Sequence, residues 1–141
     1  PRQYGIKQMH KHLKEMKAIT GLENEPIFCP IVSDFYSGMV VTVPLFASQL
    51  NDGKTAEDIK KVYAAKYVGE LVKYSPSIDE NGMISAAGMS LSDAMQVTVA
   101  GNDDRILLIA RYDNLGKGAS GAAVQCLNLI IGANQTDGLE I

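Results

Sequence analysis

The sequence has few cysteines and no long apolar run, and each of these features argues against one class of protein. Only two cysteines, Cys29 and Cys126, occur among 141 residues, far apart and in apolar surroundings. Such a chain has no disulfide framework, which favours a reducing cytosol. No apolar run approaches the roughly 18 residues of a membrane-spanning helix, so no membrane segment is expected. A G-x-S-x-G motif and a paired-carboxylate signature are also absent.

Excess positive charge is absent from the chain as a whole. The net charge is −3 and the pI is about 5.3, so neither nucleic acid nor a membrane surface is an expected partner. The first 17 residues differ, because they carry five positive charges against one negative: Arg2, Lys7, Lys11, Lys14 and Lys17 against Glu15. This segment is either a solvated helix face or a rim that attracts anions.

What is present suits one globular domain over residues 1–141. Hydrophobic residues make up 46% of the chain and charged residues 21%, which are ordinary values for a folded protein. The chain begins with Pro1, without a methionine or a signal-like apolar stretch. We therefore expect a fragment of a longer protein.

The spacing of apolar residues and the positions of cap, turn and helix-stop residues predict the secondary structure. Spacings of three and four predict a first helix, stopped by Gly21, through Ile6, Met9, Leu13, Met16 and Ile19. Thr55 caps a second helix through residue 66, and a third runs from about 120 to 131. Strands are expected at 38–46, 71–74, 95–100 and 105–112, with an extended segment at 26–32. The last two strands form an antiparallel hairpin. The order indicates an α+β fold with a mixed, mainly antiparallel sheet and helices on one face.

Residues Gly116–Gly121 match the dinucleotide motif G-x-G-x-x-G letter for letter, after a strand and before a helix. Only 20 residues follow Gly121, so no second parallel strand can complete a βαβ unit. The complete fingerprint is therefore not expected. Two readings stay open: a helix start that binds anions or admits a ligand closely, and a glycine-rich turn that only permits tight packing.

The only two histidines are His10 and His12. In a helix, side chains two residues apart diverge by about 200°, whereas in an extended segment they share a face. No Cys, Asp or Glu stands nearby at ligand spacing, so no metal site is expected. Acid–base chemistry by one histidine and an ordinary surface role both remain open. Cys29 and Cys126 are expected in the core, because no base, cation or helix start activates either thiol.

Several segments together resemble a known family. Residues 111–125 (RYDNLGKGASGAAVQ), then 127–129 (LNL) and 136–139 (TDGL), resemble the C-terminal signature of N-acetyl-gamma-glutamyl-phosphate reductases. Near the front, Tyr4-Gly5 and His10-Lys11-His12 are similar to the family's His-Arg-His segment. The related aspartate-semialdehyde dehydrogenases usually lack a glycine matching Gly121 and the Asn-Leu after the glutamine. The resemblance runs from about Tyr4 to Leu139.

This resemblance implies a fold and a reaction. The fold would be that of the C-terminal domain of glyceraldehyde-3-phosphate and aspartate-semialdehyde dehydrogenases. The reaction would reduce N-acetyl-glutamyl phosphate, releasing phosphate and the semialdehyde, in arginine biosynthesis. NADP(H) would be bound mainly by another domain. The family's catalytic cysteine lies in a Gly-Cys-aromatic-Pro-Thr type segment that this chain lacks, so we expect the chain alone to be inactive.

The resemblance also assigns residues. His10 would be the catalytic histidine, and His12, Lys11 and Ser37 would contact substrate, although Ser37 stands where the family has arginine. The cofactor would be contacted by Asn114, Gly118, Ala119 and Gly121. The helix at about 117–132 would pack against a missing NADP-binding domain, and the protein would be a homodimer or homotetramer. Two alternatives stay open: a non-catalytic binding or oligomerisation module, and an aspartate-semialdehyde dehydrogenase domain.

Overall fold

The structure is a computed structural model that describes residues 1–141 throughout. The chain forms two compact units, Pro1–Tyr36 and Ser37–Ile141. No helix could span a bilayer: the longest have 11 residues, where about 20 are needed.

The N-terminal unit, Pro1–Tyr36, consists of a short β-ribbon and one helix. β1 (Arg2–Gln3) pairs antiparallel with β2 (Ile31–Val32), so the predicted extended segment becomes a strand only at its end. Between these strands lies α1 (Lys11–Thr20). It ends at Gly21 as predicted, and Gly21 has a left-handed φ of 71° that glycine adopts without steric cost.

The predicted start of this helix at Ile6 is wrong, because α1 begins only at Lys11. Ile6 and Met9 are strongly exposed. Gln8, between them, has a left-handed φ of 51°. Its side-chain amide donates to the carbonyl oxygen of Phe28 at 2.7 Å and accepts from the Phe28 N–H at 2.9 Å. The chain therefore turns here to pair with a distant backbone segment, and the apolar spacing at 6 and 9 was coincidental.

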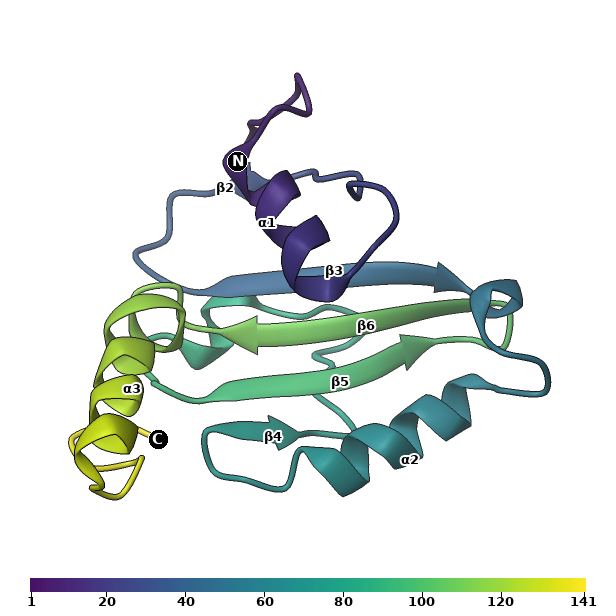
Figure 1. Cartoon of the computed structure of the whole chain (residues 1–141). Coiled ribbons are helices and arrows are strands. Elements are labelled where there is room, and N and C mark those ends of the chain that lie inside the picture. The colour runs from purple at the N-terminus through teal and green to yellow at the C-terminus, as the bar shows by residue number, and fades with distance from the viewer. The chain divides into compact units, whose positions relative to one another are not determined.

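The second unit, Ser37–Ile141, is built on a four-stranded sheet in the order β3-β6-β5-β4 (Figure 1). Its strands are β3 (Met39–Phe46), β4 (Val72–Tyr74), β5 (Met95–Gly101) and β6 (Arg105–Tyr112). β6 runs antiparallel to both β3 and β5, whereas β4 runs parallel to β5. The predicted α+β fold with a mixed, mainly antiparallel sheet is confirmed.

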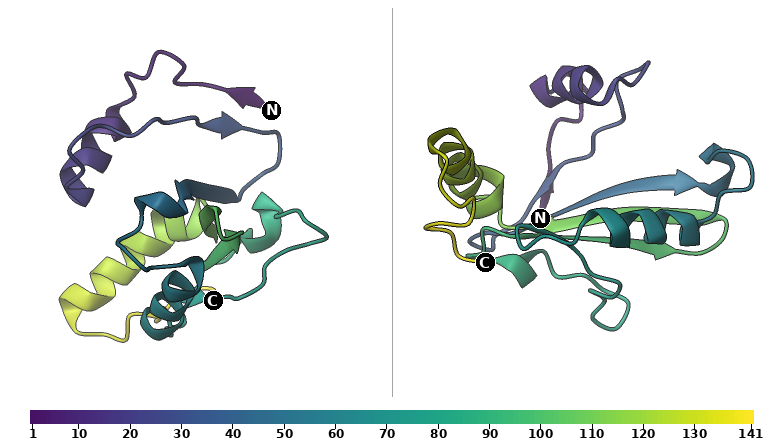
Figure 2. Two further views of the ribbon diagram at one scale, coloured as in Figure 1. Left: turned by 90° about the vertical axis from the view of Figure 1, so that its right-hand side faces the viewer. Right: turned by 60° about the horizontal axis from the view of Figure 1, so that its bottom comes forward.

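Helices and a connecting segment cover opposite faces of this sheet (Figure 2). α2 (Ala56–Lys66) packs against β5, and the side chain of Thr55 accepts from the Asp58 N–H as predicted for a cap. The Asp58 carboxylate accepts in return from the N–H and the hydroxyl of Thr55, and these two bonds to the carboxylate lower its pKa. On the other face, the 3-10 helix Ala86–Met89 contacts β3 and β6.

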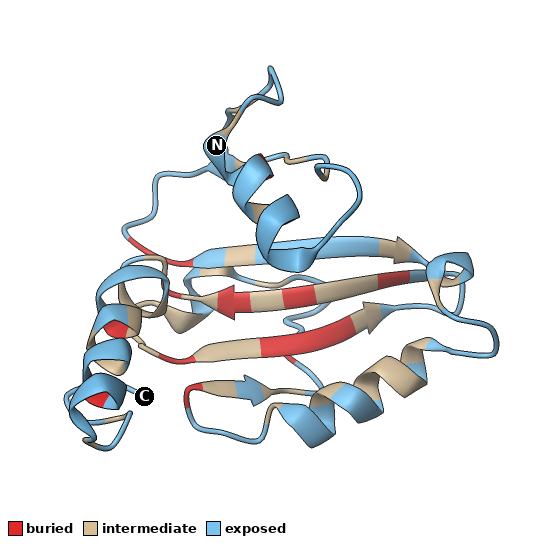
Figure 3. Cartoon of the chain, viewed as in Figure 1, coloured by how far each residue is buried: buried red, intermediate tan, exposed pale blue.

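The core of this unit lies along the two central strands, β5 and β6, as Figure 3 shows. Residues 97, 99 and 106 are buried on the face that carries α2, and residues 98, 109 and 111 on the other. The edge strand β3 is different, because Met39, Val41, Val43 and Phe46 remain exposed. Pro44 lies in the middle of this strand. The sheet is therefore well covered at its centre and bare along β3.

The last helix, α3 (Gly121–Ile131), follows one π-helical turn at Gly116–Ser120. Leu127, Leu129, Ile130 and Ile131 on it are exposed. The expectation that Cys126 and Cys29 are core residues is wrong, since both are exposed. Apolar neighbours in the sequence suggested burial, but on α3 those neighbours are themselves exposed.

Candidate functional site

An aromatic cluster in the N-terminal unit contains both histidines. The ring centroids of His10 and His12 lie 4.6 Å apart in an edge-to-face arrangement. Phe28 and Tyr4 lie 5.3 Å and 5.8 Å from His10. The histidines meet because His10 is extended, with φ −71° and ψ 140°, while His12 lies in the first helical turn. The helical geometry that would have separated them therefore does not apply.

His10 is the N-cap of α1. Its Nδ1 accepts a hydrogen bond from the His12 N–H at 3.3 Å, which occupies one of the free donors at the helix start. A neutral imidazole that accepts at Nδ1 carries its proton on Nε2. His10 thus presents Nε2 as a donor, and a proton could be added only at Nδ1, at the expense of the cap.

The other two predicted residues of this segment are exposed. Nε2 of His12 lies 3.7 Å from Oε2 of Glu15, one helical turn further on. This carboxylate would stabilise a protonated ring, although solvent weakens the interaction. Lys11, the first residue of α1, forms no side-chain hydrogen bond or ion pair. No group of three or more His, Cys, Asp or Glu side chains is arranged to hold a metal ion.

A second polar cluster lies in the sheet unit, around Asp113 at the end of β6. Asp113 is 1% exposed. Its Oδ2 accepts from the Ser37 hydroxyl at 2.6 Å and from the Leu91 N–H at 2.5 Å. Its Oδ1 accepts from the N–H groups of Leu115 at 2.7 Å and Gly116 at 3.1 Å. One buried carboxylate thus joins three segments that are far apart in the sequence.

These hydrogen bonds keep Asp113 ionised. Burial alone would raise the pKa of this carboxyl, because a low-dielectric environment disfavours charge. The four donors outweigh that effect and lower the pKa from 3.8 to about 2. The carboxylate is therefore an acceptor at neutral pH and has no proton to transfer. Its chemistry is to hold donors in place.

Two residues predicted to contact ligands belong to this second cluster. Ser37 is buried, and its hydroxyl proton is committed to Asp113. The carbonyl oxygen of Ser37 accepts from Ser90 Oγ at 2.6 Å. Oδ1 of Asn114 accepts from the Gly38 N–H at 2.8 Å, whereas the Asn114 Nδ2 group forms no hydrogen bond within the chain. No buried side-chain nitrogen lacks a partner, so this Nδ2 group reaches the surface.

The glycines predicted to admit the cofactor are not equivalent. Gly118 and Ala119 are exposed. Gly121 is buried, and a Cβ there would collide with the carboxylate of Asp93. The residues thus fit an edge contact with a nicotinamide cofactor, through Asn114, Gly118 and Ala119. The fold itself requires a glycine at position 121, because a side chain there would occupy the space of the Asp93 carboxylate.

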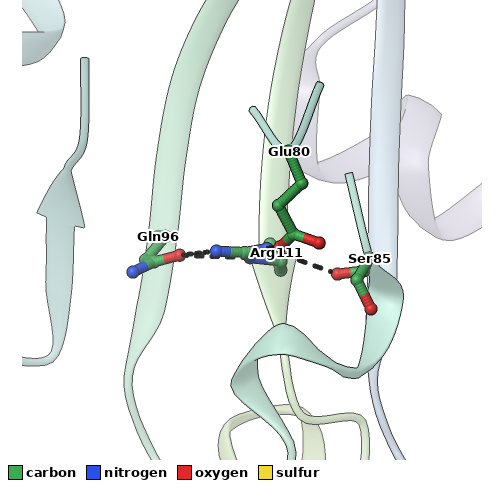
Figure 4. A network of polar contacts seen from close by, with 4 residues as sticks. All are labelled: Glu80, Ser85, Gln96 and Arg111. Carbon is green, nitrogen blue, oxygen red and sulfur yellow. Dashed lines mark hydrogen bonds and ion pairs between the residues drawn. The ribbon is translucent and has the colours of Figure 1, made fainter. Parts of the chain in front are cut away.

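A third polar network holds the connecting segment 79–92 on the sheet (Figure 4). Nε and Nη2 of Arg111 donate to Gln96 Oε1 at 3.1 Å and 2.7 Å. Nη1 donates to Glu80 Oε1 at 3.1 Å and to the Ser85 carbonyl oxygen at 3.4 Å. Gly88 lies so close that a Cβ would meet the guanidinium group. Arg111 is buried, and its charge is balanced by Glu80.

Sequence reasoning missed the roles of Asp113 and Arg111, although both lie in the signature segment 111–125. A signal was available in the sequence. An arginine at the end of an apolar strand, two residues before an aspartate, indicates buried polar groups that need partners. Apart from the local N–H groups of Leu115 and Gly116, their partners lie 15 to 76 residues away, and nothing in the spacing identifies them.

Comparison with protein families gives one match over most of the chain. Residues 1–114 match the family described as semialdehyde dehydrogenase, dimerisation domain. The chain therefore belongs to the semialdehyde dehydrogenase dimerisation-domain family. This agrees with the fold that the C-terminal signature implied.

Individual relatives narrow the resemblance. The chain is 42% identical to N-acetyl-gamma-glutamyl-phosphate reductase 2 of Nostoc sp., over 96% of this chain and 45% of that protein. It is 40% identical to N-acetyl-gamma-glutamyl-phosphate reductase of Allorhizobium ampelinum, over 92% of this chain and 44% of that protein. The resemblance to this class of reductase is confirmed. The chain spans less than half the length of these curated relatives.

Proposed function

We propose that this chain is the substrate-side and subunit-contact part of an N-acetyl-gamma-glutamyl-phosphate reductase. The observation that carries the proposal is the similarity, at about 40% identity over more than nine-tenths of the chain, to proteins of that name. The alternative of an aspartate-semialdehyde dehydrogenase has less support. Gln125 and Asn128, two residues of the distinguishing signature, bond to the C-terminal tail here: Asn128 Nδ2 donates to the Asp137 carbonyl oxygen at 2.8 Å.

The histidine cluster would supply the proton transfers of this reaction. His10 would donate a hydrogen bond from Nε2 to an oxygen of the reacting substrate, because its Nδ1 is committed to the helix cap, and this bond would stabilise negative charge that develops on that oxygen. His12 has no hydrogen bond to either ring nitrogen, and Glu15 would stabilise it after it accepts the proton of a thiol. Lys11 and the other positive side chains of residues 1–17 would attract the phosphorylated substrate. The nucleophilic cysteine would come from another part of the full-length protein.

The cofactor would be held mostly outside this chain. NADPH would supply the hydride, and Asn114, Gly118 and Ala119 would contact it from the sheet unit. The exposed apolar side chains of α3 would pack against the cofactor domain, and those of β3 would meet a second copy of the chain. The full-length protein would be a cytoplasmic homo-oligomer.

A reductase assay on the full-length protein tests this proposal. With N-acetyl-glutamyl phosphate and NADPH we expect turnover, and with aspartyl phosphate we expect far less. The isolated 141-residue chain should show none, because no activated thiol is present. A full-length protein that favours aspartyl phosphate would support the alternative dehydrogenase, and one inactive on both substrates would support a binding module.

A further inference from the structure

The buried carboxylate of Asp113 has no part in the proton transfers proposed above, yet it forms four hydrogen bonds, a number matched in the sheet unit only by Arg111. Four donors converge on it, from Ser37, Leu91, Leu115 and Gly116. Such convergence is costly to build in a buried site unless every group is satisfied, and here every group is.

Ser37 connects Asp113 to the start of β3. The hydrogen bond from its hydroxyl to Asp113 fixes the residue immediately before Gly38. Gly38 has a φ of 124° that other residues rarely adopt, and a Cβ there would collide with the backbone of Ala86. The position of the Gly38 N–H is thus determined from both sides, by Ser37 and by the 3-10 helix.

The fixed Gly38 N–H then sets the orientation of Asn114. It donates to Asn114 Oδ1 at 2.8 Å, so the amide cannot flip without losing that bond. On its other side, Asn114 is held by its neighbours Asp113 and Leu115, which are joined through the Asp113 carboxylate. The remaining Nδ2 group can only donate, and it reaches the surface. Asn114 is therefore presented as a donor to a carbonyl oxygen.

We infer that Ser37 and Asp113 are positioning residues, whose hydrogen bond fixes Asn114 as a donor to the carboxamide oxygen of a nicotinamide ring. The inference rests on the proposed function. It also gives Ser37 a different role from the substrate contact that the resemblance implied, because the hydroxyl is buried and committed to Asp113.

Binding by the full-length protein tests this assignment with two ligands. NADPH contains the nicotinamide ring, whereas 2′-phospho-ADP-ribose lacks it and reports on the rest of the site. Ser37→Ala removes one donor to Asp113, and Asn114→Asp removes the Nδ2 donor while keeping an oxygen for the Gly38 N–H. Both variants should weaken NADPH binding roughly three- to tenfold, as for the loss or misplacement of one hydrogen bond, and leave the affinity for 2′-phospho-ADP-ribose unchanged.

Two controls separate positioning from general damage. Ser77→Ala removes an exposed hydroxyl outside the cluster and should change neither affinity. Val99→Ala weakens the core of the same unit and should lower the melting temperature without a selective loss of NADPH. Equal weakening of both ligands by Ser37→Ala, or no weakening, would overturn the inference while leaving the proposed function intact. A wild-type protein that binds neither ligand would overturn both.

Discussion

The histidine cluster of the N-terminal unit and the Asp113 cluster of the sheet unit differ in how far they expose their ionisable groups to solvent. The cluster of the N-terminal unit leaves its histidine rings partly in contact with solvent and holds them by edge-to-face packing and one cap hydrogen bond. The cluster of the sheet unit buries a carboxylate completely and surrounds it with four donors. The first arrangement suits groups that exchange protons, and the second suits a group that must never do so.

The largest effect predicted from this comparison is on catalytic activity, at His10. In the full-length protein, His10→Asn should lower kcat/KM by about 10²- to 10³-fold, the usual cost of losing one hydrogen-bond donor to a developing negative charge. The helix should survive, because asparagine is among the best N-cap residues. Steady-state kinetics and a thermal melt on the same sample measure both quantities.

His10→Ala provides the control for this substitution. It removes the ring and the cap together, so it should lower activity as much and also cost about 1 kcal/mol of stability. A His10→Asn protein that keeps full activity would show that the ring does no chemistry and serves only as a cap.

At Asp113 the expected loss is in stability. Asp113→Asn leaves an NH₂ group facing donors on one side, so at least one pair of N–H or O–H groups loses its acceptor. The free energy of unfolding should fall by about 2–4 kcal/mol at neutral pH, which urea denaturation can measure.

The pH dependence of the stability difference between wild type and Asp113→Asn supplies a second check. The pKa of Asp113 is lowered to about 2 in the folded state, so its contribution to stability is complete above about pH 4 and is lost as the pH falls towards 2. Wild type and Asp113→Asn should therefore converge in stability over that range. A gap that stays constant from pH 7 to pH 2 would show that the charge of Asp113 contributes nothing.

A smaller effect is expected in the glycine-rich segment. Gly121→Ala should destabilise the chain by about 1–3 kcal/mol, because the new methyl group overlaps the Asp93 carboxylate. Gly118→Ala should cost less, since Gly118 is exposed and its Cβ would lie 3.2 Å from the Tyr112 ring and 3.3 Å from the Asp113 carbonyl oxygen, which are tight contacts but not overlaps. Thermal melts compare the two directly. The reverse order would mean that the ring of Tyr112, and not Asp93, constrains this segment.

The smallest predicted effect is a loss of stability confined to one of the two units. Gln8→Ala removes two hydrogen bonds to the Phe28 backbone, at a cost of about 1 kcal/mol that is confined to the N-terminal unit. Hydrogen exchange should become faster at the Phe28 amide and stay unchanged at Val99 in β5. Faster exchange at both sites would indicate that the units unfold as one.

Much of the fold could be predicted from local patterns. β-branched residues predicted β3, the short turn between two strand segments predicted the hairpin of β5 and β6, and Thr55 predicted the start of α2. Each of these signals depends on residues close in sequence. The start of α1 was mispredicted because Gln8 bonds to Phe28, twenty residues away, and such a partner leaves no trace in periodicity.

For the candidate site, too, some features could be predicted from the sequence and others could not. The segment carrying His10, Lys11 and His12 could be identified by resemblance, but the contact between the rings depends on where the helix begins. The cluster around Asp113 could not be predicted from residue spacing. Ser37 and Asp113 lie 76 residues apart, and only the register of β3 with β6 brings them together. The exposure of Cys126 could not be predicted from its apolar neighbours, because Leu127 and Leu129 are exposed themselves. The neighbours of Cys29, Phe28 and Pro30, are only partly buried, so their apolar character did not indicate a core position.

Pro44 in the middle of β3 has a consequence for solubility. β3 is an edge strand whose partner on one side is β6, and its other edge is open. Proline has no N–H group, so a further strand added to that edge would lack a hydrogen bond at its centre. Copies of this chain are thereby discouraged from lining up into one continuous intermolecular sheet. Association of copies through β3 would therefore depend on its exposed side chains and not on continued backbone pairing along that edge.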